Sequence, residues 1–154
     1  MPLETTDSLN RQTLEALQEL TQLNIDSAEG FHAAAEDCGD IRISQLFVAL
    51  GTERKQQAAE LQKYLLANDV TPCREGSTVA ALHRAWTAIR TALSGHDPHT
   101  ALCEAERGED RIKGRYERAL RETAGSAVND VLMRQYAQVK SAHDRVRNLR
   151  DQLG

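Results

Sequence analysis

The sequence contains little of what β-sheet proteins and disulfide-bonded proteins rely on. Only 4% of its 154 residues are aromatic, and it has just 9 glycines, 3 prolines and 3 cysteines. The cysteines are odd in number and widely spaced, which excludes a disulfide framework and a CxxC zinc site. The residues that dominate, Ala, Leu, Glu, Arg and Gln, are strong helix formers. We therefore expect an all-α protein, and the length suits one domain over residues 1–154.

The chain also lacks a long apolar run and an excess of basic charge. No apolar stretch approaches the roughly 20 residues that a membrane-spanning helix needs. The 19 basic and 23 acidic residues give a net charge of −4, so the positive field that drives non-specific nucleic-acid binding is missing. The first residues show neither the charged nor the apolar region of a signal peptide. We expect a cytoplasmic protein that binds neither membranes nor nucleic acids.

Capping and breaking residues divide the sequence into helices. Asp7 or Ser8 is suited to cap the first helix and Asp40 the second. The pair Asp97-Pro98 favours another helix start, because proline is pre-set for the first helical position. Apolar residues recur at spacings of three and four between these signals. The predicted helices cover about residues 8–37, 40–68, 78–93, 98–123 and 127–153.

The lengths of the links predict how the helices are arranged. The turns after the first and fourth helices are short, so each joins an antiparallel hairpin. The link between the second and fourth helices, roughly 30 residues, is long enough to return along the bundle. The short helix within it contains Trp86, which we expect to anchor it to the bundle. The prediction is a four-helix bundle with a short extra helix in a long crossover.

One acidic residue interrupts the apolar seam of the helix at 98–123. The seam positions are Leu102, Ala105, Glu109, Ile112, Tyr116 and Ala119. A buried carboxylate is costly unless it is paired, protonated or bound to a metal. The residue opposite Glu109 is therefore important for any function of the bundle.

Reflecting each hairpin about its turn predicts which residues share the level of Glu109. Reflection about the first turn places Asn24 opposite Arg54, and reflection about the last turn places Glu109 between Lys140 and His143. Arg54 and Glu109 lie at similar distances from the starts of their helices. We therefore predict a buried polar layer made of Asn24, Arg54, Gln57, Glu109 and His143.

The sequence resembles ferritin-like proteins. The stretch LFVALGTERKQQAAELQKYL resembles the second helix of rubrerythrin-type and YciF-like proteins. The whole chain, with SAEGFHAAAED, ALHRAWTAI, CEAERGEDRIKGRYERAL and AHDRVRNLRDQLG, more closely resembles a bacterial ferritin-like four-helix-bundle family of unknown function. The resemblance implies a ferritin-like four-helix bundle and, at the level of Glu109, the place where such bundles hold two metals.

The metal-ligand positions of ferritin-like di-iron proteins are only partly occupied by ligand residues in this sequence. The resemblance aligns the ligand Glu and His of the second helix with Arg54 and Gln57, or, one residue earlier, places Glu53 at the first ligand. In the last helix the corresponding positions are Lys140 and His143. The candidate ligands for iron or manganese are Glu29, Glu53, Glu109 and His143.

Two interpretations of the layer remain open. In the favoured one, Arg54 pairs with Glu109 and supplies the positive charge that metals supply elsewhere, while Gln57, Asn24 and His143 satisfy the remaining hydrogen-bonding groups. In the other, the candidate ligands retain a metal.

The last helix carries a basic stripe on its outer face. The stripe consists of Arg134, Lys140, Arg145, Arg147 and Arg150. Aromatic residues are not interleaved with it as in single-strand nucleic-acid binders. We interpret it as a solvated face laced to neighbouring acids.

Three functions fit these observations. The first, to which we give preference, is a non-catalytic, stress-associated or scaffold protein without a cofactor, which self-associates as a homo-oligomer such as a dimer. The second is a di-iron or di-manganese oxidoreductase or metal-handling protein. The third is a binder of a small molecule or lipid between the crossover helix and the bundle.

Overall fold

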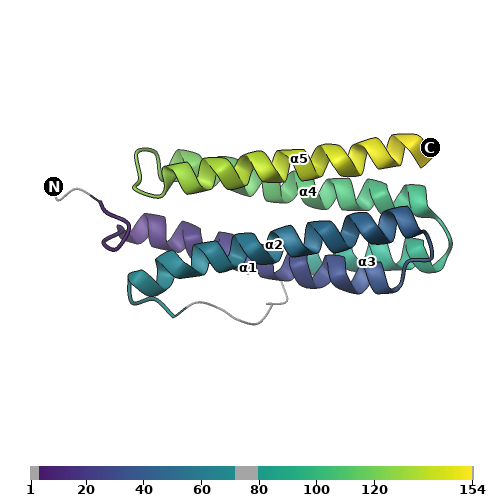
Figure 1. Cartoon of the computed structure of the whole chain (residues 1–154), viewed down its shortest axis with the longest axis horizontal. Helices are drawn as coiled ribbons and strands as arrows, with labels where there is room; N and C mark the ends of the chain where they lie inside the picture. Colours follow the sequence, from purple (N-terminus) through teal and green to yellow (C-terminus); the bar gives the residue numbers. More distant parts are fainter. Residues whose placement is uncertain (1–3, 72–79, 154) are drawn as a thin grey trace.

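The structure is a computed structural model that describes residues 4–71 and 80–153, with only the backbone at residues 80–82. The described residues form five helices (Figure 1). These are α1 (Arg11–Glu36), α2 (Ile41–Ala67), α3 (Ala80–Ser94), α4 (Pro98–Glu122) and α5 (Asn129–Leu153). The all-α prediction is confirmed, and the predicted start of the third helix at residue 78 lies outside the described residues.

The first helix begins three residues later than predicted because a different residue caps it. The side chain of Asn10 accepts a hydrogen bond from the backbone N–H of Thr13 at 2.9 Å. The predicted cap, Asp7, instead accepts a hydrogen bond from the hydroxyl of Thr5 at 2.8 Å. Asp40 and Asp97 cap α2 and α4, the positions at which the sequence places them.

The last helix begins at Asn129 and not at residue 127, because Ser126 starts a turn before the helix. Its hydroxyl accepts a hydrogen bond from Val128 N–H at 3.2 Å, and its carbonyl accepts one from Asn129 N–H at 3.1 Å. The carboxylate of Glu4 accepts hydrogen bonds from the Ser126 hydroxyl and the Ala127 N–H. The segment before α1 thereby fastens the turn between α4 and α5.

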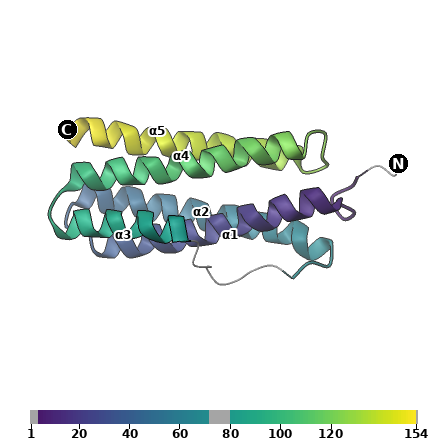
Figure 2. The same ribbon diagram turned by 180° about the vertical axis from the view of Figure 1, so that it is seen from behind.

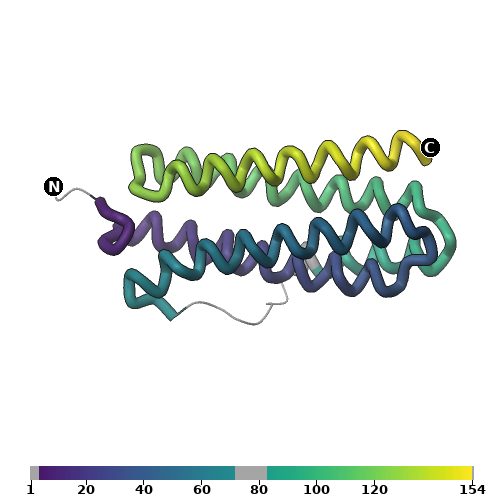
Figure 3. Tube along the Cα trace, viewed as in Figure 1, coloured from purple at the N-terminus to yellow at the C-terminus, as the bar shows by residue number. Residues whose placement is uncertain are grey.

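The four long helices run along one axis, and each is antiparallel to the two long helices that it contacts (Figure 1). Helices α1 and α2 form one antiparallel hairpin, and α4 and α5 form another (Figure 1). Helix α3 leads back towards the end where α2 begins, so α4 starts at that end and runs parallel to α2 (Figure 3). The predicted crossover is therefore present. Helices α1 and α4 are in contact, as are α2 and α5, which leaves α2 and α4 diagonally opposite.

A polar layer divides the hydrophobic core into two parts. One cluster fills the end near the α1–α2 turn and includes Phe31, Phe47 and Leu102. The other fills the opposite end and includes Leu17, Leu61 and Leu132. On α1, α2 and α4 the two sets are separated by predicted layer positions, which are Asn24, Arg54 with Gln57, and Glu109. On α5 the boundary falls between Val139 and Ala142, so His143 lies beyond it. The layer thus lies at the middle of the bundle.

Helix α3 packs closely on α1 through Trp86. A Cβ atom added at Gly30 would lie 2.0 Å from Cε2 of Trp86, so only glycine permits this approach. The indole also contacts Phe31 edge-on, with ring centroids 4.8 Å apart. Figure 2 shows α3 running along the bundle axis, and it contacts both α1 and α4. Trp86 therefore anchors the crossover helix.

None of the helices in the described part of the chain combines the length and apolar character needed to cross a membrane.

Candidate functional site

Arg54 and Glu109 meet at the centre of the bundle. A guanidinium nitrogen of Arg54 on α2 donates a hydrogen bond to Oε2 of Glu109 on α4. Each side chain is only 1% exposed, and Arg54 is among the largest fully buried side chains of the described residues. Because α2 and α4 are diagonal neighbours, this ion pair spans the bundle from corner to corner.

The ion pair extends to α5 through two glutamines. A second guanidinium nitrogen of Arg54 donates to Oε1 of Gln57 at 2.9 Å. The amide nitrogen of Gln57 donates in turn to Oε1 of Gln138 at 3.0 Å. The position of Gln57, one turn after Arg54 on α2, allows the amide to accept from the guanidinium and continue the network. Three helices are therefore linked through one arginine.

A second network joins α1, α4, α5 and α2 around Tyr116. The amide nitrogen of Asn24 donates to the Tyr116 hydroxyl at 2.8 Å, and that hydroxyl donates to Oε1 of Gln135 at 2.7 Å. The amide nitrogen of Gln135 donates to Oε1 of Glu60 at 2.7 Å. Burial raises the pKa of Tyr116 to about 12, so the phenol keeps its proton and remains a donor at neutral pH.

The pKa values of the two glutamates in these networks, Glu109 and Glu60, are shifted in opposite directions. Burial raises the pKa of Glu109, and the charge of Arg54 only partly opposes this effect. The Oε1 atom of Glu109 has no hydrogen-bond partner among the described residues, so the loss of hydration is incompletely compensated. Glu60 is less buried, and a hydrogen bond from Arg134 lowers its pKa.

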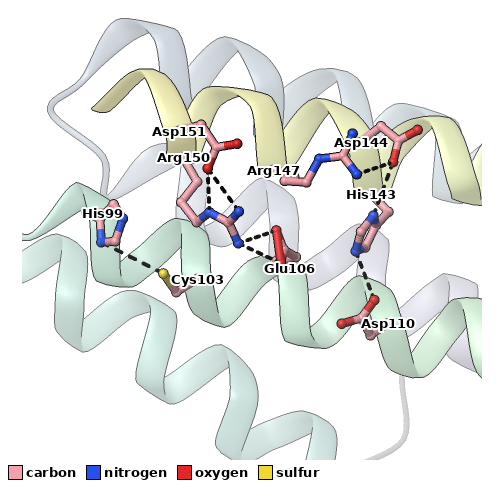
Figure 4. A network of polar contacts seen from close by, with 9 residues as sticks. All are labelled: His99, Cys103, Glu106, Asp110, His143, Asp144, Arg147, Arg150 and Asp151. Atoms are coloured by element: carbon pink, nitrogen blue, oxygen red, sulfur yellow. Dashed lines mark hydrogen bonds and ion pairs between the residues drawn. The ribbon is translucent and has the colours of Figure 1, made fainter. Parts of the chain in front are cut away.

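His143 lies beside the layer and is not part of its hydrogen-bonded network. Its Nε2 lies 2.9 Å from Oδ1 of Asp110, and its Nδ1 lies 3.3 Å from Oδ1 of Asp144 (Figure 4). The side chain is 15% exposed. The two carboxylates occupy opposite sides of the ring, so they are not placed to chelate one metal together with it.

The four candidate metal ligands are not gathered into one cluster. Glu29 is exposed on α1, whereas Glu109 is buried in the interior. Glu53 forms an ion pair with Arg145 on α5, and His143 faces Asp110. Within residues 4–71 and 80–153, no group of three or more His, Cys, Asp and Glu side chains is arranged to hold a metal ion.

Four residues of these two networks are not in the layer that the sequence predicts. These are Tyr116, Gln135, Gln138 and Glu60. A signal for Gln135 was present, because it lies between Leu132 and Val139 and completes the spacing of threes and fours along α5. Tyr116 was identified only as an apolar seam residue, although its hydroxyl is the centre of one network.

The arginines of α5 form ion pairs with neighbouring acidic residues. Arg150 contacts Glu106 on α4 at 2.6 Å and Asp151 at 2.9 Å (Figure 4). Arg134 contacts Glu60 at 2.6 Å. The ammonium of Lys140 lies 5.5 Å from the centroid of the Tyr136 ring. This arrangement corresponds to the solvated, ion-paired face that the sequence suggests.

A protein-family model matches the part of the chain that forms the first four helices. A family model described as a domain of unknown function, DUF2383, matches residues 12–122, which cover nearly all of α1 and the whole of α2, α3 and α4. A search of curated proteins returns no match. The matched segment contains Arg54, Glu109 and Tyr116, whereas α5 lies beyond it. Because the match covers more than half of the chain, the protein belongs to the DUF2383 family.

Proposed function

We propose that the chain is a ferritin-like, non-catalytic helical bundle that acts in the cytoplasm as a stress-associated or scaffold protein. The observation that supports this most is the buried Arg54–Glu109 ion pair. It lies in the middle of the bundle, at the level where ferritin-like proteins hold their metals. The proposal also includes self-association. The protein would then act through contacts at its surface, and its interior would carry out no chemistry.

Arg54 is suited to replace a metal as the source of positive charge. A guanidinium keeps its charge at every physiological pH and offers five N–H donors. Arg54 donates from one terminal nitrogen to Glu109 and from the other to Gln57, and its Nε has no hydrogen-bond partner among the described residues. A divalent metal would need several oxygen or nitrogen ligands around one point, and the guanidinium would repel it. The layer therefore favours a fixed helix register over redox chemistry.

The alternative functions have less support. A di-iron or di-manganese oxidoreductase would need Glu53 and His143 to exchange their contacts with Arg145 and Asp110 for metal bonds. A ligand site under the crossover helix would need space beside Trp86, which instead contacts α1 closely. A depression of about 390 Å³ beside α3 is lined by polar residues such as Arg90.

Metal analysis tests the non-catalytic proposal directly. Protein purified without chelator is expected to contain far less than one iron or manganese per chain. A stoichiometric metal that is lost in Glu109→Ala and retained in Glu29→Ala would contradict the proposal. Glu29 is the matched control because it is a candidate ligand that lies exposed on α1.

Restoring metal ligands in α2 tests whether the layer lies where ferritin-like proteins hold their metals. In the double variant R54E/Q57H, the charge that repels a metal is removed and a Glu–x–x–His pattern faces Glu109. We expect cobalt(II) or manganese(II) to bind this variant and to raise its melting temperature, while R54Q gains no such response. A folded double variant that binds neither ion would contradict the positional equivalence with ferritin-like metal sites.

A further inference from the structure

The outward surface of α2 carries a line of exposed apolar side chains. Ile41, Val48 and Leu66 are 66%, 46% and 54% exposed. They are seven and eighteen residues apart, and at 100° per residue these spacings place all three within about 20° of one another around the helix. Three of the four large apolar side chains that are exposed in the described residues thus share one stripe.

A groove lies beside this stripe, between α1 and α2. It has a volume of about 780 Å³, and its lining includes Ile25 and Ala33 of α1 together with Ala59 and Leu66 of α2. Leu66 belongs to both the groove and the stripe. We call the groove and the stripe together the outer face of α1–α2. Six of the eleven residues that line the groove are apolar, and the stripe adds Ile41 and Val48 to this apolar surface.

Charges without partners border the same face. Glu29 and Glu36 line the groove from α1, and Lys55 lines it from α2. No ion pair within the described residues involves any of these three side chains, whereas the arginines of α5 are paired. The charges that line the groove from α1 are therefore acidic and the one from α2 is basic, and none of them is neutralised by an ion pair within the described residues.

We infer that the outer face of α1–α2 binds the same face of a second copy of this chain, an inference that rests on the self-association in the proposed function. A two-fold axis along the helices places α1 of one copy on α2 of the other, so these acidic and basic charges meet twice. A two-fold axis across the helices would place α1 on α1 and bring the glutamates together.

The size and register of the face suit a dimer. Helix α2 has 27 residues, which gives a length of about 40 Å, and two adjacent helices make a face of about 800 Å². This is the area that each partner buries in a standard stable interface. Phe31 packs on Phe47, so Glu29 is level with residue 49 of α2. Lys55 is then about 9 Å further along the axis, within the combined reach of the two side chains.

Sedimentation equilibrium of the full chain tests the apolar part of the interface. We expect a monomer–dimer equilibrium in the wild type and at least a tenfold weaker dimer in V48D/L66D, because the charges would be buried in the contact. The control is M133D on α5, since Met133 is 55% exposed and lies outside this face. We expect its dissociation constant to stay within about twofold of the wild-type value. A wild type that is monomeric at all concentrations, or an equal loss in M133D, would overturn the inference.

A charge exchange tests the orientation of the two copies. K55E alone and E29K alone should each weaken the dimer by about three- to tenfold, because each places like charges together at two symmetric points. The double variant E29K/K55E should recover the wild-type dissociation constant. Additive losses in the double variant would overturn this orientation. Dimerisation with stoichiometric iron would contradict the non-catalytic part of the proposed function and leave the interface intact. A metal-free monomer would contradict the interface and the proposed self-association, and would leave the non-catalytic part intact.

Discussion

The buried layer and the outer face of α1–α2 each contain a glutamate and a basic residue, but those of the layer are buried and those of the outer face are exposed to water. In the layer, Glu109 and Arg54 are 1% exposed and are bonded to each other. On the outer face, Glu29 and Lys55 form no ion pair within the described residues. Burial makes an unpaired charge expensive, whereas water makes it inexpensive. The layer therefore fixes contacts within the chain, and the outer face keeps its charges free for a partner.

The largest expected difference between the two regions comes from removing one glutamate from each. Glu109→Ala should lower the free energy of unfolding by about 3–5 kcal/mol, because it leaves the buried Arg54 without its carboxylate. Glu29→Ala should change it by less than about 0.5 kcal/mol. Urea denaturation followed by circular dichroism measures both values. Equal effects would mean that the ion pair does not stabilise the folded chain.

A smaller effect is expected from the neutral part of the layer. Tyr116→Phe removes a hydroxyl that both accepts from Asn24 and donates to Gln135. We expect a loss of about 1–3 kcal/mol in the same denaturation experiment, because Gln135 Oε1 is left buried without its donor.

Tyr136 provides the matched control for that prediction. Its hydroxyl donates to Glu117 at 2.6 Å, but the side chain is only half-buried. Tyr136→Phe should cost less than Tyr116→Phe, since water can replace the lost partner. A larger loss of unfolding free energy for Tyr136→Phe than for Tyr116→Phe would show that the hydrogen bonds of the Tyr116 hydroxyl do not stabilise the fold.

The smallest expected effect is a difference in pH dependence between two glutamates. Burial raises the pKa of Glu109 above its ordinary value of 4.5. The raised pKa therefore adds to the free energy of unfolding, fully below pH 4.5, and this contribution is lost as the pH rises through the folded-state pKa. Glu4 behaves oppositely: burial is outweighed by hydrogen bonds from Ser126, Asn10, Ala127 and Thr13, which lower its pKa. Its stabilisation is present above pH 4.5 and is lost as the pH falls.

Glutamine substitutions separate these two contributions. The stability of the wild type minus that of Glu109→Gln should decrease as the pH rises above 4.5. The corresponding difference for Glu4→Gln should decrease as the pH falls below 4.5. Thermal unfolding across this range gives both curves. Two curves with the same slope would contradict one of the assigned pKa directions.

The layer was predictable in part because two hairpins have short turns. Reflection about the first turn places Asn24 opposite Arg54, and the similar distances of Arg54 and Glu109 from the starts of their helices place them at one level. The structure brings Arg54 and Glu109 into contact. The short turns restrict how far the paired helices can slide, so the level follows from residue counting. Glu29 and His32 form a Glu–x–x–His sequence, but Glu29 lies exposed on α1, so this spacing alone does not place a glutamate in the layer.

The position of His143 could not be obtained in this way. It follows Ala142, a buried seam residue, and one residue turns the side chain by about 100° around the helix. Asp110 follows Glu109 in the same manner, so His143 and Asp110 meet at the edge between α4 and α5. Small rotations of a helix decide such contacts, and a spacing pattern does not determine them.

The sequence by itself determined the helices, their turns and the level of a polar layer, because periodicity and capping act over a few residues. Only the tertiary structure decided that Arg54 reaches Glu109 diagonally across the bundle, that Gln135 joins Tyr116, and which acids pair with the arginines of α5. These contacts depend on the rotation of each helix and on side-chain reach, which are set by the packing of residues far apart in the chain.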